Sequence, residues 1–216
     1  MTKSQRIFFS HYLEALFPDA KAELDFTNNF ELIVAVVLSA QTTDIAVNKV
    51  TKPLFKKYPT PEKLMHANLE DVMEIINSIG LYKTKAKNII GLAARLVQDY
   101  GGEVPNDRAA LESLPGVGRK TANVVLSNAF GVPALAVDTH ILRISKRLGL
   151  ADLDDNALEV EKKLNKQFPK ELWHKLHHQL IFFGRYHCLA RKPNCGTCKM
   201  QSMCPHYKNV ISKQKN

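Results

Sequence analysis

All four cysteines of this 216-residue chain lie within 17 residues near its C-terminal end, in the pattern Cys-x6-Cys-x2-Cys-x5-Cys. Such a dense group indicates a disulfide framework or a metal centre rather than ordinary packing residues. Disulfide frameworks are typical of small secreted domains, whereas this chain shows no secretory signal and can bury a sizeable core. Structural zinc usually takes two close ligand pairs and here there is one, while iron–sulfur clusters accept uneven runs. The spacing therefore predicts a metal centre and leaves zinc and iron–sulfur open. Its ligands would be Cys188, Cys195, Cys198 and Cys204.

The same end of the chain carries the excess positive charge. The formal net charge is +9, from 30 lysines and arginines against 21 acids. Residues 172–216 hold eight of these cations and no acid. The nearly neutral remainder has cation clusters at Lys83–Lys87 and at residues 119–120, which acids elsewhere balance. This distribution favours a polyanionic partner, nucleic acid before anionic membrane, although a solvated basic tail would have the same composition. The eight cations are Lys175, Arg185, Arg191, Lys192, Lys199, Lys208, Lys213 and Lys215.

The rest of the chain predicts helices and no strands. It contains no Asn-Gly or Asp-Gly hairpin turn, and no run alternates apolar and polar residues. The apolar, β-branched run from Leu32 to Leu38 could form a buried strand, but its helical neighbours offer no partner, so we expect a fully buried helix. This run is far shorter than the roughly 18–20 residues that cross a bilayer, so no membrane partner is expected. Helix start signals are Thr60 before Pro61, Asn68 before Asp71, Asp154 and Asp155 before Leu158, and Pro169 before Leu172.

An internal sequence repeat indicates two similar helical hairpins. Residues 79–86 align with residues 115–122 at an offset of 36, and each stretch precedes a helix that opens with basic residues. In the second stretch a proline and two glycines predict a tight turn, in which Gly116 and Gly118 can take positive φ. Without side chains there, backbone N–H groups can approach a phosphate directly, and Arg119 adds charge. A plain glycine turn between packed helices would have the same sequence.

Two ionisable residues at predicted helix starts have two interpretations each. Lys120 could be one more phosphate contact, or a neutral amine that acts as a nucleophile and forms a Schiff base. Its place beside the positive end of a helix dipole disfavours the charged form, as the second interpretation requires, but from the residues alone the phosphate contact is the first expectation. Asp138 precedes an apolar helical run and is expected to be an N-cap. A rigid cap also holds a carboxylate in a fixed direction, so capping and catalysis are compatible.

Taken together, these features resemble the endonuclease III family of DNA glycosylases with abasic-site lyase activity, over nearly the whole chain. Residues 114–122 are similar to the family's helix-hairpin-helix, which implies that Lys120 is the catalytic lysine. Residues 137–140 are similar to the segment that bears the family's catalytic aspartate, here Asp138. The cysteine run matches the family's [4Fe–4S] site, and this resemblance implies iron–sulfur rather than zinc.

The resemblance also implies how DNA is bound. Gln41, within residues 38–44, would enter the gap left by the extruded base, and Leu81, within residues 80–82, would press on the opposite strand. The turn glycines and several cations would contact the backbone or shape the pocket. These further residues are Gly116, Gly118, Arg119, His140, Arg143, Arg191 and Lys192.

The fold implied by resemblance is all-α, with two helical domains and a DNA cleft between them. One is a six-helix domain of residues 22–132, and the other combines residues 1–21 with residues 133–216 and ends in the cluster. The implied activity is base excision repair of damaged double-stranded DNA, in which oxidised pyrimidines are removed through a lysine Schiff base. Strand cleavage 3′ to the site by β-elimination follows. We expect a structural cluster, a monomer and a bacterial cytoplasmic location.

Three other functions share parts of this pattern. An adenine-specific mismatch glycosylase has the same cysteine spacing but lacks a lysine at the position of Lys120, and a thymine-mismatch glycosylase usually lacks it too. A non-catalytic helix-hairpin-helix or redox-sensing cluster protein would bind DNA without cleaving an abasic duplex. His174, His177 and His178 could suggest a second metal site, but phosphate-facing or surface roles are expected for them.

Overall fold

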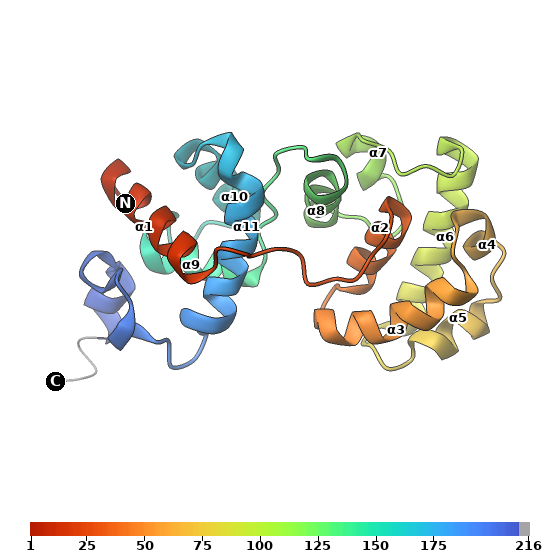
Figure 1. Cartoon of the computed structure of the whole chain (residues 1–216), viewed down its shortest axis with the longest axis horizontal. Helices are drawn as coiled ribbons and strands as arrows, with labels where there is room; N and C mark the ends of the chain where they lie inside the picture. The colour runs from red at the N-terminus through yellow and green to blue at the C-terminus, as the bar shows by residue number, and fades with distance from the viewer. Residues whose placement is uncertain (212–216) are drawn as a thin grey trace. The chain divides into compact units, whose positions relative to one another are not determined.

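The computed structural model describes residues 1–211, and all regular structure in that range is helical (Figure 1). The all-α class expected from the sequence is therefore confirmed. The chain forms two compact units, one of residues 23–132 and the other of residues 1–22 together with the chain from Pro133 onward. Within residues 1–211, every helix is too short or too polar to pass through a lipid bilayer. Lys213 and Lys215 of the basic segment lie outside the described residues.

The unit of residues 23–132, here the hairpin unit, begins with the apolar run. Residues 32–38 are almost completely inaccessible to solvent, because this run is the buried helix that its sequence predicts. The helices of the unit are α2 (Asn29–Leu38), α3 (Asp44–Lys57), α4 (Pro61–Met65), α5 (Leu69–Ile76), α6 (Tyr82–Tyr100), α7 (Arg108–Glu112) and α8 (Arg119–Phe130).

Both expected hairpins are present in this unit. Helices α5 and α6 form the first and α7 and α8 the second, and the two helices of each pair are in contact. The buried helix α2 contacts α6 and α8, so both hairpins rest on one apolar helix. The predicted start signals at Thr60 and Asn68 are confirmed, because their side-chain oxygens accept hydrogen bonds from backbone N–H groups in the first turns of α4 and α5.

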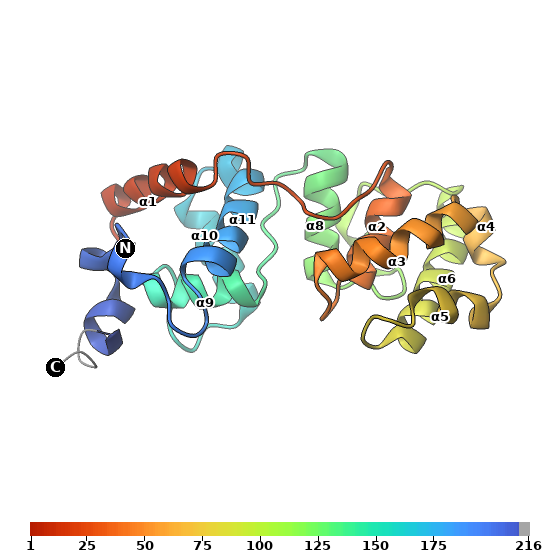
Figure 2. The same cartoon turned by 60° about the horizontal axis from the view of Figure 1, so that its bottom comes forward.

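The second unit, here the cysteine unit, brings the first helix of the chain against a late one (Figures 1 and 2). Phe9 and Leu13 are fully buried beside Phe183, and the rings of Phe9 and Phe183 meet edge to face at 5.5 Å between centroids. The elements are α1 (Lys3–Leu16), α9 (Thr139–Leu148), α10 (Ala157–Gln167), η1 (Lys170–Leu172), α11 (Trp173–Phe182), η2 (Phe183–His187), η3 (Cys195–Thr197), η4 (Gln201–Met203) and η5 (Tyr207–Ile211).

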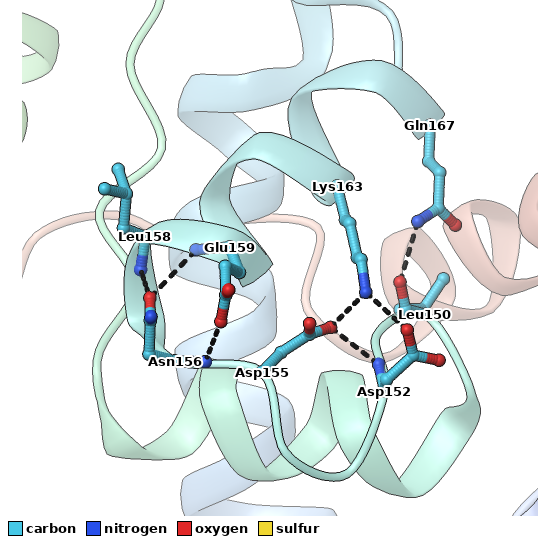
Figure 3. Close-up of polar contacts among 8 residues, drawn as sticks. All are labelled: Leu150, Asp152, Asp155, Asn156, Leu158, Glu159, Lys163 and Gln167. Atoms are coloured by element: carbon cyan, nitrogen blue, oxygen red, sulfur yellow. Dashed lines mark hydrogen bonds and ion pairs between the residues drawn. The ribbon is translucent and has the colours of Figure 1, made fainter.

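The start of α10 differs from the prediction (Figure 3). Asp154 and Asp155 were expected to open this helix, but the N-cap is Asn156. The Asn156 side chain accepts hydrogen bonds from backbone N–H groups of the first turn. In return, the backbone N–H of Asn156 donates to a carboxylate oxygen of Glu159 at 2.6 Å. Asp155 instead pairs with Lys163 at 2.5 Å. The reciprocal capping box therefore selects one of three adjacent polar residues.

Candidate active site

The turn between α7 and α8 leaves its backbone accessible. Gly116 has φ +78°, and a Cβ at this position would lie 3.0 Å from both the Nδ2 of Asn88 and the Cγ1 of Val37. Gly118 was also expected to be able to take positive φ, but its φ is −98°, and it serves as the N-cap of α8 without a side-chain hydrogen bond. The N–H groups at the start of α8 therefore have no side-chain cap and are suited to an anion.

Lys120 is the second residue of α8 and is exposed within the hairpin unit, as is the preceding Arg119. The predicted position of this lysine, in the first turn after the glycine turn, is confirmed. Lys120 belongs to the same uncapped first turn, so one short stretch of backbone carries both a candidate phosphate site and a candidate nucleophile.

Asp138 is the N-cap of α9 in the cysteine unit, as predicted. One carboxylate oxygen accepts a hydrogen bond from the backbone N–H of Ile141 at 2.8 Å. The side chain is half-buried, and this bond restricts the direction in which its second oxygen points. Asp138 is therefore a rigid carboxylate at the end of a helix.

Two arginines on the next turns of α9 hold the chain that leads into the cysteine run. Arg143 donates to the carbonyl oxygens of Gly184 at 2.8 Å and Cys188 at 3.1 Å. Arg147, one turn later, donates to the carbonyl of Leu189 at 2.6 Å and approaches the Cys188 Sγ at 3.4 Å. Resemblance assigned Arg143 to DNA, whereas the structure engages its guanidinium with backbone of its own unit.

His140 lies on the same side of α9, and its ring Nδ1 is 3.3 Å from an Arg143 nitrogen. Burial lowers the pKa of His140, the nearby charge of Asp138 opposes this, and two arginine charges reinforce it. A Cβ added to Gly184 would come within 2.8 Å of the His140 Cβ, so glycine at 184 permits the close approach.

The four cysteines line one cavity in the cysteine unit, together with Phe183, His187 and Arg147. No disulfide joins them. Burial raises the pKa of Cys198 to about 11, and the charges of the other three cysteines contribute, so the four sulfurs lie within electrostatic reach of one another. Among the described residues, no group of three or more His, Cys, Asp or Glu side chains is close enough together to bind one metal ion. Four half-buried thiols around a shared cavity fit the donor set of an iron–sulfur cluster.

The loop between the first two cysteines presents Arg191 and Lys192, both exposed. Lys192 has φ +50°. In residues 1–211 only two other non-glycine residues have positive φ, namely Gln41 at +55° and Leu81 at +59°. Such conformations are uncommon for side chains with a Cβ and cluster at functional sites. All three belong to the residues for which resemblance implies DNA contact.

Gln41 and Leu81 both lie on exposed loops of the hairpin unit. Leu81 is 60% exposed, although it is apolar, and it precedes α6 directly. Gln41 follows the buried helix α2 and is exposed too. The hairpin unit therefore carries Gln41, Leu81 and the turn with Lys120, while the cysteine unit carries Asp138 and the cysteines.

Sequence reasoning missed the position of Lys85. This residue was grouped with the other cations of Lys83–Lys87 at the hairpin turn, but it is only 4% exposed, and its Nζ donates to the Thr42 Oγ1 at 2.7 Å. The signal was its register, because Lys85 occupies the apolar stripe of α6. That stripe consists of Lys85, Ala86, Ile89, Leu92, Ala93 and Leu96.

The histidines of α11 are also placed differently from the expectation. His177 and His178 are 3% and 5% exposed, so surface and phosphate-facing roles are wrong for this pair. Burial lowers the pKa of His178 to about 3, and the charges of His177 and His174 add to this. The helix buries them because α1 and α9 both pack against α11.

Comparisons with known proteins identify the family of this chain. Residues 34–170 match the family described as HhH-GPD superfamily base excision DNA repair protein. Endonuclease III of Bacillus subtilis is 59% identical over 88% of this chain and 86% of its own length, and endonuclease III of Escherichia coli is 48% identical over 97% and 99%. A solved structure of a trapped endonuclease III–DNA covalent intermediate is 54% identical over the whole of both chains, with a TM-score of 0.94. With a matching domain, close relatives and a shared fold, the chain belongs to the endonuclease III family within the HhH-GPD superfamily of base excision DNA repair proteins.

Proposed function

We propose that this chain is a bifunctional DNA glycosylase and abasic-site lyase that removes oxidised pyrimidines from double-stranded DNA. The observation that carries the proposal is Lys120, an exposed amine in the uncapped first turn of a hairpin helix. Family membership supports base excision repair, and a similar protein has been trapped as a covalent intermediate with DNA.

In the proposed reaction the damaged nucleotide leaves the base stack, because C1′ of its sugar cannot be reached inside the duplex. The neutral amine of Lys120 attacks C1′ and forms a C–N bond. The bond from C1′ to the base breaks, and the base leaves with its electron pair and takes up a proton. The proton lost by the lysine nitrogen passes to a base. The Asp138 carboxylate is assigned to stabilise the positive charge that develops on the sugar or to assist proton transfer.

Strand cleavage follows from the same covalent bond. The C1′–O4′ bond then breaks with its electron pair on O4′, which takes up a proton, and an iminium remains between Lys120 and C1′. This iminium makes the proton on C2′ acidic. Loss of this proton and departure of the 3′ phosphate with the electrons of the C3′–O bond break the strand. Water then hydrolyses the iminium and returns Lys120 as an amine. No step needs an oxidant or a reductant.

DNA is held by groups on both units. The N–H groups beside Gly116 and Gly118, with Arg119, bind a phosphate near the nucleophile. Gln41 and Leu81 occupy the space vacated by the extruded base. In the cysteine unit Arg191, Lys192 and His140 contact the backbone. Arg143 acts indirectly, since its guanidinium holds the segment that ends at Cys188.

Cys188, Cys195, Cys198 and Cys204 bind a [4Fe–4S] cluster, which the cavity that they share supports. These cysteines would hold the cluster between the loop with the exposed cations and the η3–η4 region. Its role would be structural, because no step of the proposed reaction moves an electron. Iron and sulfide analysis of the purified protein tests this, with about four irons per chain expected. We also propose that the protein is a monomer and acts in the cytoplasm, where the DNA of the bacterial relatives lies.

Borohydride trapping tests the catalytic proposal, because it reduces the iminium and leaves protein bound to DNA. A duplex with one thymine glycol is cleaved without borohydride and cross-linked with it. Lys120→Ala should lose both signals. Lys83→Ala is the matched control, since Lys83 is also exposed and is the second residue of the corresponding hairpin helix α6. Cross-linking by Lys120→Ala would refute the assignment, and DNA binding by the native chain without any base release would indicate a non-catalytic protein.

A further inference from the structure

Lys85 is a buried cation with one defined partner. Its ammonium group donates to the Thr42 hydroxyl at 2.7 Å across 43 positions of sequence, and burial lowers its pKa. On the buried stripe of α6 an apolar side chain would avoid the desolvation of an amine. Helix packing alone therefore does not explain a lysine at this position.

The two ends of Lys85 reach the two strained loops of the hairpin unit. Its backbone N–H donates to the carbonyl of Leu81 at 3.0 Å and closes the first turn of α6. Its side chain holds Thr42, the neighbour of Gln41. One residue is thus bonded directly to Leu81 and to the residue beside Gln41.

Thr42 in turn fixes the backbone on the other side of Gln41. Its N–H donates to the carbonyl of Ser39 at 3.0 Å, and its hydroxyl donates to the carbonyl of Ala40 at 3.3 Å. The hydroxyl therefore donates one hydrogen bond to the turn and accepts another from Lys85. Because Gln41 has φ +55°, such surrounding bonds are needed to keep it in this conformation.

We propose that Lys85 is a positioning residue that locks the Gln41 loop to the Leu81 turn, so that both side chains enter the DNA in a fixed relative arrangement. This inference rests on the proposed function, in which these two side chains fill the gap left by the extruded nucleotide. The role is confined to duplex DNA, because a single strand has neither a gap nor an opposite strand to press on.

The test compares two substrates under single-turnover conditions, a duplex and a single strand that each carry one abasic site. Lys85→Met removes the donor and keeps an unbranched chain in the apolar stripe. We expect cleavage of the duplex to slow by roughly tenfold to a hundredfold, which is the effect of a small misplacement of positioning groups. Cleavage of the single strand should change by less than about twofold on the same reasoning.

Substitutions at Thr42 provide the matched pair and remain informative if Lys85→Met does not fold. Thr42→Val keeps the shape and loses both the acceptor for Lys85 and the donor to the Ala40 carbonyl, so it should lose cleavage of the duplex alone by at least as much. Thr42→Ser keeps the hydroxyl and should behave as the native chain. In the double variant Lys85→Met/Thr42→Val the two effects should not add. Equal loss on both substrates, or none on either, overturns the role of Lys85. Failure of the native chain to cleave either substrate would instead overturn the proposed function.

Discussion

Replacing Asp138 by asparagine separates the capping of α9 from the proposed catalysis. The cap bond runs from the Ile141 N–H to one carboxylate oxygen at 2.8 Å, and an asparagine carbonyl offers the same acceptor at the same reach. Asparagine and aspartate rank equally as N-caps, so the stability lost is that of a charge at a helix N-terminus, about 0.3–1 kcal/mol. Asp138→Ala also loses the cap bond, at a cost of about 1 kcal/mol more.

The effect on turnover should be far larger than the effect on stability. If Asp138 has the proposed catalytic role, loss of its carboxylate charge should lower single-turnover cleavage of a thymine glycol duplex by roughly 10²–10⁴-fold. DNA affinity, measured by fluorescence anisotropy, should persist because no phosphate contact is removed. Thermal unfolding measured alongside should show a midpoint lowered by only a few degrees.

Asp107 offers a matched control. It caps α7 through an acceptor 2.8 Å from the Ala110 N–H, so Asp107→Asn makes the same chemical change at another helix start. It should cost a similar small amount of stability and leave turnover within about threefold of the native rate, since no reacting group is touched. The reasoning about Asp138 is refuted if Asp138→Asn keeps native turnover, or if Asp107→Asn loses as much.

Three further predictions concern stability, DNA binding and the turn. Because the pKa of His178 is about 3 in the folded chain and about 6.5 when unfolded, the unfolded chain binds the proton first, and stability is lost as the pH falls below about 6.5. Between pH 7.5 and 5 this one group should remove about 2 kcal/mol, and His178→Gln should flatten that part of the pH profile of urea unfolding. Replacing Arg191 and Lys192 by alanine should weaken DNA binding and reduce the slope of log affinity against log salt by up to about 2. Gly116→Ala places a Cβ at positive φ, 3.0 Å from two side-chain atoms, and should cost about 1–2 kcal/mol or more in urea unfolding.

Each of these has an outcome that contradicts it. A pH profile unchanged by His178→Gln would mean that the buried ring does not resist protonation. An unchanged slope of log affinity against log salt would show that Arg191 and Lys192 are ordinary solvated surface residues that do not contact DNA phosphates. For the glycine, the control is Gly80→Ala in the first hairpin, where φ is not positive and nothing lies within 4 Å of the added Cβ. Equal losses at positions 80 and 116 would argue against strain at Gly116.

Local signals predicted helix starts well where one candidate cap stood alone. Thr60, Asn68 and Asp138 each cap the helix that follows, because a short polar side chain can satisfy first-turn N–H groups without help from the rest of the fold. At residues 154–156 three candidates are adjacent. Asn156 is the cap because it forms the capping box with Glu159, while Asp155 pairs with Lys163.

Charge was the property that sequence reasoning placed least well. Lys85, Arg143 and Arg147 look like surface cations, yet the first holds a loop through Thr42, and the arginines hold the backbone around Cys188. His178 likewise looks polar and is buried. Whether a charged side chain reaches solvent depends on elements that pack on it from elsewhere in the chain.

The sequence by itself determined the all-helical class, the two hairpins, the grouping of the cysteines and the helix starts at Lys120 and Asp138. All of these follow from periodicity, capping and spacing, which act over a few neighbouring residues. Only the tertiary structure decided which cations face solvent and which form hydrogen bonds to loops of the chain. It alone revealed the positive φ of Gln41, Leu81 and Lys192. Burial and backbone strain depend on contacts between segments far apart in sequence, as between Lys85 and Thr42.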